Sequence, residues 1–245
     1  MLKFLNKKHL VSNLTLCFIN TLFLISCITL SSNSFAESSA QGQNNQNQID
    51  ELFRDIRMDQ VEAVKKALHD GLSPNTVDPK GNTALTVALS EKSFKTAKLL
   101  IDTPSIDLNQ PNAANETAVM LAALNGYDDL VIYLVDKYDV ELNQPGWTVL
   151  HYASLNGHAN LVQYLLDHHA YIDALSPNGT TPLMMAARAG HIHTVKLLLD
   201  RGADMTLKNA VGMTVIEFAT SGNQTEIVLG LKSRWLKLFG APYTN

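Results

Sequence analysis

Cysteine is nearly absent from this chain of 245 residues. Its two cysteines, Cys17 and Cys27, both lie in an N-terminal segment that we expect to be removed. The mature chain would then contain no thiol at all. Such a composition suits an oxidising compartment, and it excludes a fold that depends on disulfide bonds.

The local motifs of common enzyme classes are missing as well. The sequence has no phosphate-binding loop, no Gly-x-Gly-x-x-Gly fingerprint and no serine in a nucleophile elbow. Enzyme activity is therefore unsupported, and we expect neither a catalytic residue nor a cofactor.

Histidine occurs eight times and is a common ligand of transition metals. His158, His168 and His169 are the nearest to a ligand set for a transition metal. Adjacent residues on a helix point about 100° apart, so one ion cannot easily take both His168 and His169. We therefore interpret the histidines as structural and expect no metal.

Basic residues are outnumbered by acidic ones. The 19 basic residues include Lys3, Lys7 and Lys8, whereas all 23 acidic residues follow Ala36, so the mature charge is −7 (16 minus 23). This balance argues against nucleic acid and anionic lipid as partners.

The first 36 residues have the pattern of a secretory signal peptide. Three lysines precede an apolar run at residues 10–30, and Ser34-Phe35-Ala36 is a small-x-small cleavage site. Two alternatives remain open. The apolar run is long enough for an uncleaved membrane anchor, and Leu24-Ile25-Ser26-Cys27 looks like a bacterial lipobox, with lipidation at Cys27.

Glycosylation sequons help to choose a compartment. Asn115 and Asn178 begin two of them, and both asparagines fall in predicted turns between repeats, where a glycan would crowd the surface. A eukaryotic secretory route would be awkward for such a chain. We therefore expect a periplasmic or secreted bacterial protein, with a lipoprotein or membrane-anchored protein as the alternative.

The mature chain is built from repeats of about 33 residues. A threonine recurs at spacings of 34, 31, 33 and 33, with a core aliphatic two residues later and another aliphatic seventeen residues later. Aligned copies at a fixed period indicate a repeat architecture. The threonines are Thr83, Thr117, Thr148, Thr181 and Thr214; the aliphatics at the second position are Leu85, Val119, Leu150, Leu183 and Ile216; those at the third are Leu100, Leu134, Leu165, Leu198 and Leu231.

Each copy predicts a pair of helices, most clearly at residues 179–204. Thr181 can cap the first helix, with Pro182 at its first position. The first helix ends at Gly190, and a second helix follows. Gly202 ends the second helix in the left-handed conformation. A helix pair of this size cannot bury its apolar faces alone, so it needs neighbours of the same shape.

These motifs resemble the ankyrin repeat family. Residues 181–186 (Thr-Pro-Leu-Met-Met-Ala) and 148–153 (Thr-Val-Leu-His-Tyr-Ala) are similar to its Thr-Pro-Leu-His-x-Ala signature, and Gly202-Ala203-Asp204 is similar to its closing turn. The resemblance implies an all-α solenoid of about six helix-turn-helix repeats with short β-hairpin fingers. It also implies a binding surface along the concave side of the stack.

The chain then divides into segments. We expect a signal peptide (1–36), a flexible linker (37–48), the repeat domain (49–236) and a C-terminal tail (237–245). Asp50 would cap the first helix, and the terminal repeats would present polar outer faces. The tail would fold back over the last helix through Leu238, Phe239 and Tyr243. The predicted repeats are 49–77, 78–110, 111–144, 145–174, 175–207 and 208–236.

The resemblance also places candidate contact residues. Between the third and fourth repeats the connection is three residues shorter than its predecessor, so the finger that carries Trp147 must be short. Trp147 and Arg188 have the chemistry of a binding hot spot. Alternatively, Trp147 packs on its own finger while Leu124 and Leu155 cover helix ends. The predicted partner-binding residues are Trp147, Arg188, Leu124, Asn125, Leu155, Asn156, Glu116, Thr180 and Met213.

The function that follows is non-enzymatic protein binding in the cell envelope through the concave face and finger tips. An alternative is an accessory or inhibitory subunit of a periplasmic enzyme. A metal carrier and a structural role at the membrane through Cys27 are further hypotheses. The identity of a protein partner cannot be read from the sequence, because one fold hosts many functions.

Overall fold

The computed structural model describes residues 43–244. The predicted signal peptide and Cys27 lie outside the described residues. The chain divides after Glu51 into two compact units, which we describe separately.

In the first unit, residues 43–51 are helical. Gln46 Nε2 donates to Asp50 Oδ1 at 3.0 Å, one turn further along this helix. The predicted flexible linker (37–48) is therefore wrong for residues 43–48, and Asp50 lies inside a helix rather than at its cap. Glutamine has a good helix propensity, which the polar composition concealed.

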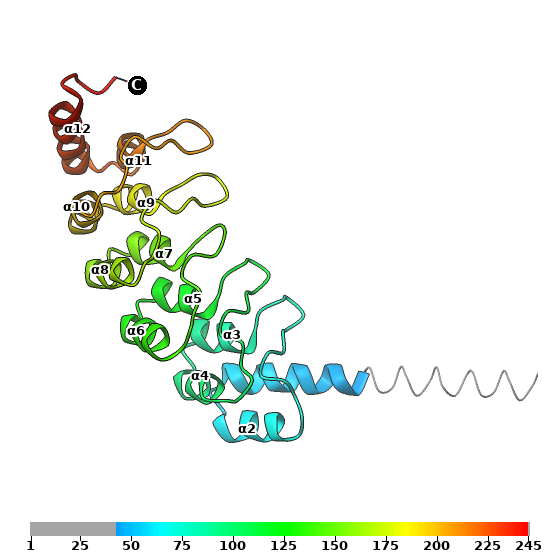
Figure 1. The fold of residues 1–245 in the computed structure, drawn as a ribbon. Coiled ribbons are helices and arrows are strands. Elements are labelled where there is room, and N and C mark those ends of the chain that lie inside the picture. Colours follow the sequence, from blue (N-terminus) through cyan, green and yellow to red (C-terminus); the bar gives the residue numbers. More distant parts are fainter. Residues whose placement is uncertain (1–42, 245) are drawn as a thin grey trace, which may run out of the picture. The chain divides into compact units, whose positions relative to one another are not determined.

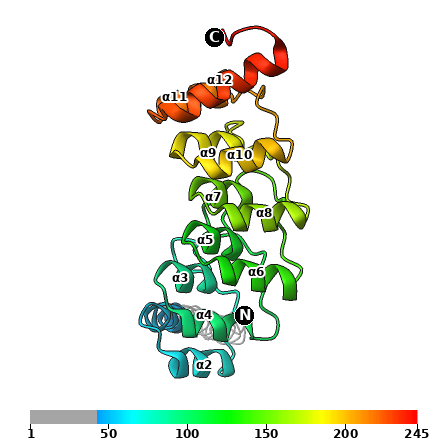
Figure 2. The same ribbon diagram turned by 90° about the vertical axis from the view of Figure 1, so that its left-hand side faces the viewer.

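The second unit is an all-α stack of helix pairs (Figures 1 and 2). Residues 52–57 complete the first pair with α2. We call α3, α5, α7, α9 and α11, which lie next to the projecting loops, the inner helices, and the even-numbered helices the outer helices (Figure 1). The helices are α2 (Val61–His69), α3 (Ala84–Ser90), α4 (Phe94–Ile101), α5 (Ala118–Leu124), α6 (Asp128–Lys137), α7 (Val149–Leu155), α8 (Ala159–Asp167), α9 (Pro182–Ala189), α10 (Ile192–Asp200), α11 (Val215–Ser221) and α12 (Thr225–Phe239).

Capping explains where the inner helices begin and end. The Thr83 hydroxyl accepts from the Thr86 amide at 3.1 Å, and the Thr181 hydroxyl accepts from the Met184 amide at 3.3 Å. Gly190 ends α9 at φ 89°. These features confirm the predicted helix boundaries in the fifth repeat to within a residue.

The core confirms the repeat alignment. The aliphatic residues two positions after each threonine are at most 3% exposed, the largest value being that of Leu85. The second aliphatic set is buried equally well, with Leu231 at 2%. The two sets therefore form continuous apolar rows through the stack, which is how helix pairs too small to fold alone gain a common core.

The projecting loops are less regular than predicted. Within residues 43–244 they contain one isolated antiparallel bridge, Val77 with Thr83, rather than paired strands. In the second loop the Asp78 amide donates to the Asn82 carbonyl at 2.8 Å, and side chains add further bonds. Asp78 Oδ1 accepts from the amides of Lys80 and Asn82, each at 2.9 Å. Asparagine and aspartate commonly hold turns in this way.

Asparagine side chains also join successive repeats at their closing turns. Asn109 Nδ2 donates to the Asp139 carbonyl at 3.2 Å, while its Oδ1 accepts from the Glu141 amide at 2.7 Å. Asn75 and Asn143 make the same two bonds one repeat earlier and one repeat later. In the next repeat Asp173 takes this position and can only accept. We call these residues the clasp positions.

The C-terminal end differs from the prediction in two ways. Helix α12 continues to Phe239, beyond the predicted tail boundary at residue 237, and its outer face exposes Leu229 (64%) and Leu236 (48%) instead of being polar. Tyr243 does fold back on the last helix as predicted, because its ring lies 4.9 Å from that of Trp235, and its hydroxyl also donates to Glu217 Oε1 of α11. Leu238 and Phe239 remain half or more exposed.

Candidate protein-binding face

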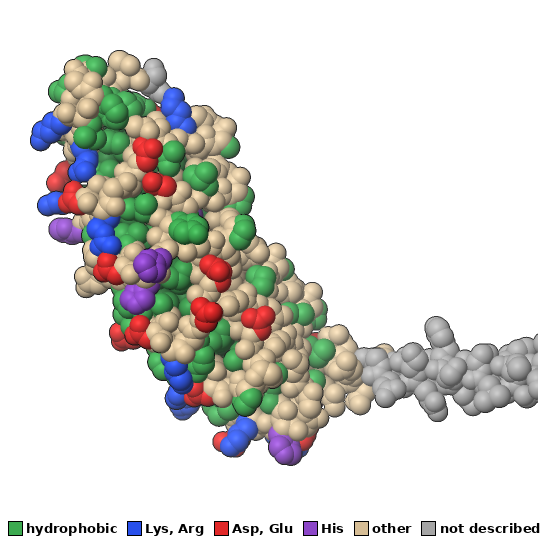
Figure 3. Space-filling model, in the orientation of Figure 1, with side chains coloured by type: hydrophobic (Ala, Val, Ile, Leu, Met, Phe, Trp, Pro, Cys, Tyr) green, Lys and Arg blue, Asp and Glu red, His purple; other side chains and the backbone are tan. Residues whose placement is uncertain are grey.

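The loops and inner helices form the face where the predicted contact residues lie. In the view of Figure 3, charged side chains gather over the outer helices, whereas the visible part of the loop side is mostly uncharged. An uncharged surface costs less to desolvate than a charged one, which favours its use as the centre of a contact.

Trp147 occupies the shortened loop before α7, where it is half-buried. Its indole meets the imidazole of His151 edge-on, with ring centroids 5.2 Å apart, and lies 6.4 Å from the ring of Tyr152. Trp147 thus packs on its own repeat, as the alternative prediction held, but part of the indole stays accessible. The packing fixes the position of that accessible part.

His151 beneath it is fully buried. Its Nδ1 accepts from the Thr148 amide at 3.1 Å, so its Nε2 must carry the proton that is donated to the Thr180 carbonyl at 2.9 Å. Burial lowers the pKa of His151 to about 4, although its hydrogen bond to the Thr180 carbonyl acts in the opposite direction. The ring is therefore neutral, and it links the fourth repeat to the fifth.

Glu116 lies beside Tyr152 on the neighbouring repeat. The Tyr152 hydroxyl donates to Glu116 Oε1 at 2.7 Å, and Asn112 Nδ2 donates to Oε2 at 3.1 Å. Burial and the neighbouring carboxylate both raise the pKa of Tyr152. Glu116 is thus a half-buried, already paired carboxylate rather than a free charge.

The four predicted residues at the ends of α5 and α7 lie side by side across the repeats. Asn156 Nδ2 donates to the carbonyls of Ala123 and Leu124 and so joins the two helix ends. Asn125 is exposed and donates to the carbonyl of Leu121 in its own helix. Leu124 and Leu155 are half-buried and cover these ends.

The remaining predicted residues divide into accessible and inaccessible. Arg188 is exposed in the last turn of α9, and Met213 is half-buried in the sixth loop. Thr180 is only 2% exposed, so its place on the contact surface was predicted wrongly. Its carbonyl accepts a hydrogen bond from the buried His151 ring, and this holds Thr180 in the interior. The family signature alone does not reveal this bond.

The shortened loop also interrupts the backbone links between neighbouring loops. The Ala113 amide donates to the Gly81 carbonyl, and the Ala210 amide donates to the Asn178 carbonyl, each at 2.9 Å. In the described chain, no such backbone bond joins the fourth loop to its neighbours. A side chain acts instead, since Asn115 Nδ2 donates to the Pro145 carbonyl at 3.4 Å.

The family model described as ankyrin repeats (3 copies) matches residues 52–144, 96–176, 137–209 and 169–234. The chain belongs to the ankyrin repeat family. The overlapping matches run through the whole series of helix pairs described above. Ankyrin repeats generally act as protein–protein interaction modules.

One polar hollow on the loop side of this ankyrin domain was only partly predicted. It has a volume of about 260 Å³ and includes Glu116, which was predicted as a contact residue, together with Lys80, Arg57 and Asp78. Arg57 Nη2 lies 3.4 Å from Asp78 Oδ2. Burial alone would raise the pKa of Asp78, but hydrogen bonds from Asn82 and Lys80 and the charge of Arg57 lower it.

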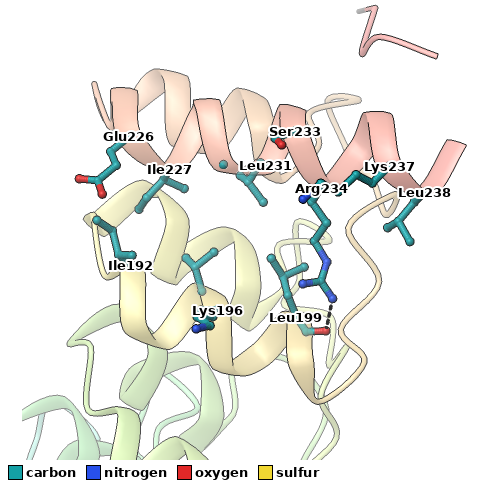
Figure 4. Close-up of a pocket in the computed structure, with 12 residues that line it drawn as sticks. Ile192, Lys196, Leu199, Glu226, Ile227, Leu231, Ser233, Arg234, Lys237 and Leu238 are labelled. Atoms are coloured by element: carbon teal, nitrogen blue, oxygen red, sulfur yellow. Dashed lines mark hydrogen bonds between the residues drawn. The ribbon is translucent and has the colours of Figure 1, made fainter. Parts of the chain in front are cut away.

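An apolar groove between the outer helices α10 and α12 was not predicted. Its volume is about 580 Å³, and its floor includes Ile192, Leu199 and Ile227 (Figure 4). Arg234 crosses it, donating from Nη2 to the Leu199 carbonyl at 2.9 Å. The sequence signal is the leucine-rich end of α12, whose last residues lie in the predicted tail.

Two further histidines of the ankyrin domain join neighbouring repeats, as His151 does. His158 Nδ1 lies 2.9 Å from Asp128 Oδ2, and His191 Nε2 donates to the Leu155 carbonyl at 2.8 Å. Both contacts join neighbouring repeats. Among the residues that the structure describes, no three His, Cys, Asp or Glu side chains are grouped as metal ligands.

Proposed function

We propose that this ankyrin repeat protein binds a protein partner through the loops and inner helices of its third to fifth repeats, without catalysing a reaction. Trp147 carries the proposal. It stands on the shortest loop, its position is fixed by His151, and part of its ring remains accessible.

The surroundings of Trp147 support a role as an anchor residue. Aromatic side chains held in one conformation lose little entropy on binding, and truncating such anchors commonly costs about 2 kcal/mol or more. Tyr152 and Glu116 beside it are hydrogen-bonded to each other, so a partner meets a preorganised surface. Arg188, exposed on the next repeat, supplies a charge able to pair with a carboxylate.

A binding measurement with paired substitutions tests this proposal. We expect Trp147→Ala combined with Arg188→Ala to weaken partner capture by tenfold or more, equivalent to about 1.4 kcal/mol. Tyr171→Ala provides the matched control, because Tyr171 is an aromatic residue that is 65% exposed in the turn after α8. Full binding by a folded double variant would refute the proposed site.

We further propose that the protein works in the bacterial cell envelope. The support is the basic and then apolar start of the chain with its small-x-small site. Among the described residues, no helix is both long and apolar enough to cross a membrane. Measuring the mass of the N-terminus after expression in bacteria distinguishes cleavage after Ala36 from lipidation at Cys27 and from an uncleaved anchor.

A further inference from the structure

The outer side of α12 carries an apolar stripe at the end of the stack. Leu229, Leu236 and Phe239 are 64%, 48% and 50% exposed, and the exposed Lys232 lies between them. At 100° per residue these four positions fall within an arc of about 80°, and they span about 15 Å along the helix. We call them the outer stripe. Among residues 43–244, α12 is the last helix of the stack, and no helix packs on this stripe (Figure 1).

The rest of the structure holds this stripe outward. The opposite face of α12 buries Ile227 and Leu231, which are 5% and 2% exposed. Arg234 fixes the rotation of the helix through the Leu199 carbonyl and through Asp200 Oδ1 at 3.2 Å (Figure 4). The core already uses the inner face of α12. Folding therefore does not require the outer stripe to be apolar.

From this surface we infer that α12 docks on an anionic membrane surface. Helices that lie in a bilayer interface combine exposed leucine and aromatic residues with flanking lysines, whose stems pack on apolar surface while their charges reach the headgroups. Besides Lys232, α12 carries Lys237, and its acidic residue is Glu226. Neither lysine has an acidic partner within residues 43–244. The local charge thus opposes the acidic balance of the whole chain.

Aromatic residues reinforce this interpretation. The ring of Trp235 lies 4.4 Å from that of Phe239 and 4.9 Å from that of Tyr243. Tryptophan is enriched at membrane–water interfaces, where one end of the side chain is apolar and the other is hydrated. The Tyr243 hydroxyl is bonded to Glu217 Oε1 and so holds the cluster in place, while Trp235 stays half-buried.

A second copy of the chain fits the outer stripe less well. Two antiparallel stripes would pair Leu229 with Leu236 of the other copy, which brings the two Lys232 ammonium groups together at the centre. The stripe contains no carboxylate to neutralise them. An anionic bilayer has no such repulsion, so charge complementarity favours the lipid surface.

Fluorescence from Trp235 tests the inference in the full chain. In a Trp147→Phe background Trp235 is the sole tryptophan, so its signal reports on α12 even if the N-terminus is also in the membrane. With vesicles of phosphatidylethanolamine and phosphatidylglycerol whose acyl chains are brominated, we expect the fluorescence to be quenched. Quenching should be much weaker with brominated phosphatidylcholine alone and should decrease at high salt.

Substitutions on α12 complete the test. Leu229→Ser with Leu236→Ser should reduce the vesicle partition constant seen by Trp235 by tenfold or more, and Lys232→Glu should reduce it while leaving the apolar residues in place. Leu175→Ser is the matched control, because Leu175 is 55% exposed in the loop before α9, away from α12. Absence of quenching, equal quenching in the substituted chains, or association of the protein with itself through the stripe in place of lipid binding would overturn the inference.

Discussion

The indole of Trp147 rests edge-on against the imidazole of His151, with 5.2 Å between ring centroids. His151 belongs to the repeat signature and is buried by the fold, whereas Trp147 belongs to the shortened loop of this chain. A residue required for folding therefore orients a residue proposed for binding. Changes that disturb the buried ring are expected to affect both stability and partner capture.

Stability should decrease below neutral pH because of His151. Its pKa is about 4 in the folded protein and about 6.5 in an unfolded chain. Between these values the unfolded chain binds a proton that the folded protein does not, so the free energy of unfolding falls as the pH is lowered, by up to about 3 kcal/mol. Urea unfolding at a series of pH values measures this. His151→Gln should unfold more easily at neutral pH but show a shallower dependence over the same window. An unchanged dependence would show that His151 is not the responsible group.

Glycine at position 157 should be far less replaceable than glycine at position 202. Both residues have positive φ, +74° and +96°, so alanine at either is strained by about 1–2 kcal/mol. A Cβ on Gly157 would also lie 2.3 Å from His191 Nδ1, whereas one on Gly202 would meet nothing within 4 Å. Displacing His191 breaks its bond to the Leu155 carbonyl, which adds about 1–3 kcal/mol. Thermal or urea unfolding of the two alanine variants gives the comparison, and equal losses would mean that the close approach to His191 has no energetic consequence.

A substitution at the clasp position of the fifth repeat, Asp173, should raise the stability of the domain. The Asp204 amide donates to Asp173 Oδ1 at 3.1 Å, but a carboxylate cannot donate in return. Burial and the nearby Asp204 carboxylate raise the pKa of Asp173, although the Asp204 amide lowers it, so ionisation is disfavoured in the fold. We expect Asp173→Asn to donate to the Gly202 carbonyl and to raise the free energy of unfolding by about 1 kcal/mol at neutral pH.

Two comparisons control this prediction. The gain should shrink once the pH falls below the carboxyl range, where Asp173 becomes neutral in both states. Asn143→Asp makes the opposite change at an intact clasp and should destabilise. A loss of stability for Asp173→Asn would show that the fifth clasp differs from the others.

Tyrosine at position 152 should stabilise the boundary between the third and fourth repeats. Its hydroxyl donates to Glu116 at 2.7 Å, and a bond to a charged acceptor in a half-buried site is worth about 1.5–3 kcal/mol. Tyr152→Phe should therefore lower the urea midpoint. Glu116→Gln keeps an acceptor and should cost less. The reverse order of the two losses would contradict this assignment.

Much of the fold could be predicted from the sequence because the repeat is redundant. The copies share a capping threonine, buried aliphatic residues and a turn between the two helices. The roles of Thr181 and Gly190 at the two ends of α9 could therefore be predicted from the pattern alone. Errors arose where the repeat ends. Gln46 and its neighbours appeared to be linker because polarity was mistaken for disorder, and α12 exceeded its expected length because no following copy marks a boundary.

The candidate face was harder to predict than the fold. The family pattern gives a position for each side chain but not its hydrogen bonds, so Thr180 was placed at the surface although the bond from its carbonyl to His151 buries it. Similarly, Glu116 was placed at a contact position, but its hydrogen bond from the Tyr152 hydroxyl could not be predicted. Pairings between repeats depend on loop lengths that differ from copy to copy, and no single-repeat motif encodes them.

The loop side of the domain is least constrained at the fourth loop, which among the described residues lacks backbone hydrogen bonds to its neighbours. The second and third loops are tied by backbone, as are the fifth and sixth, but the fourth is held to the third through side chains such as Asn115. The helices of the third and fourth repeats are still joined, by the packing of α5 on α7 and by the Tyr152–Glu116 bond. A partner beside Trp147 can therefore displace the fourth loop without breaking a backbone hydrogen bond to a neighbouring loop, while the helices beneath it stay in place.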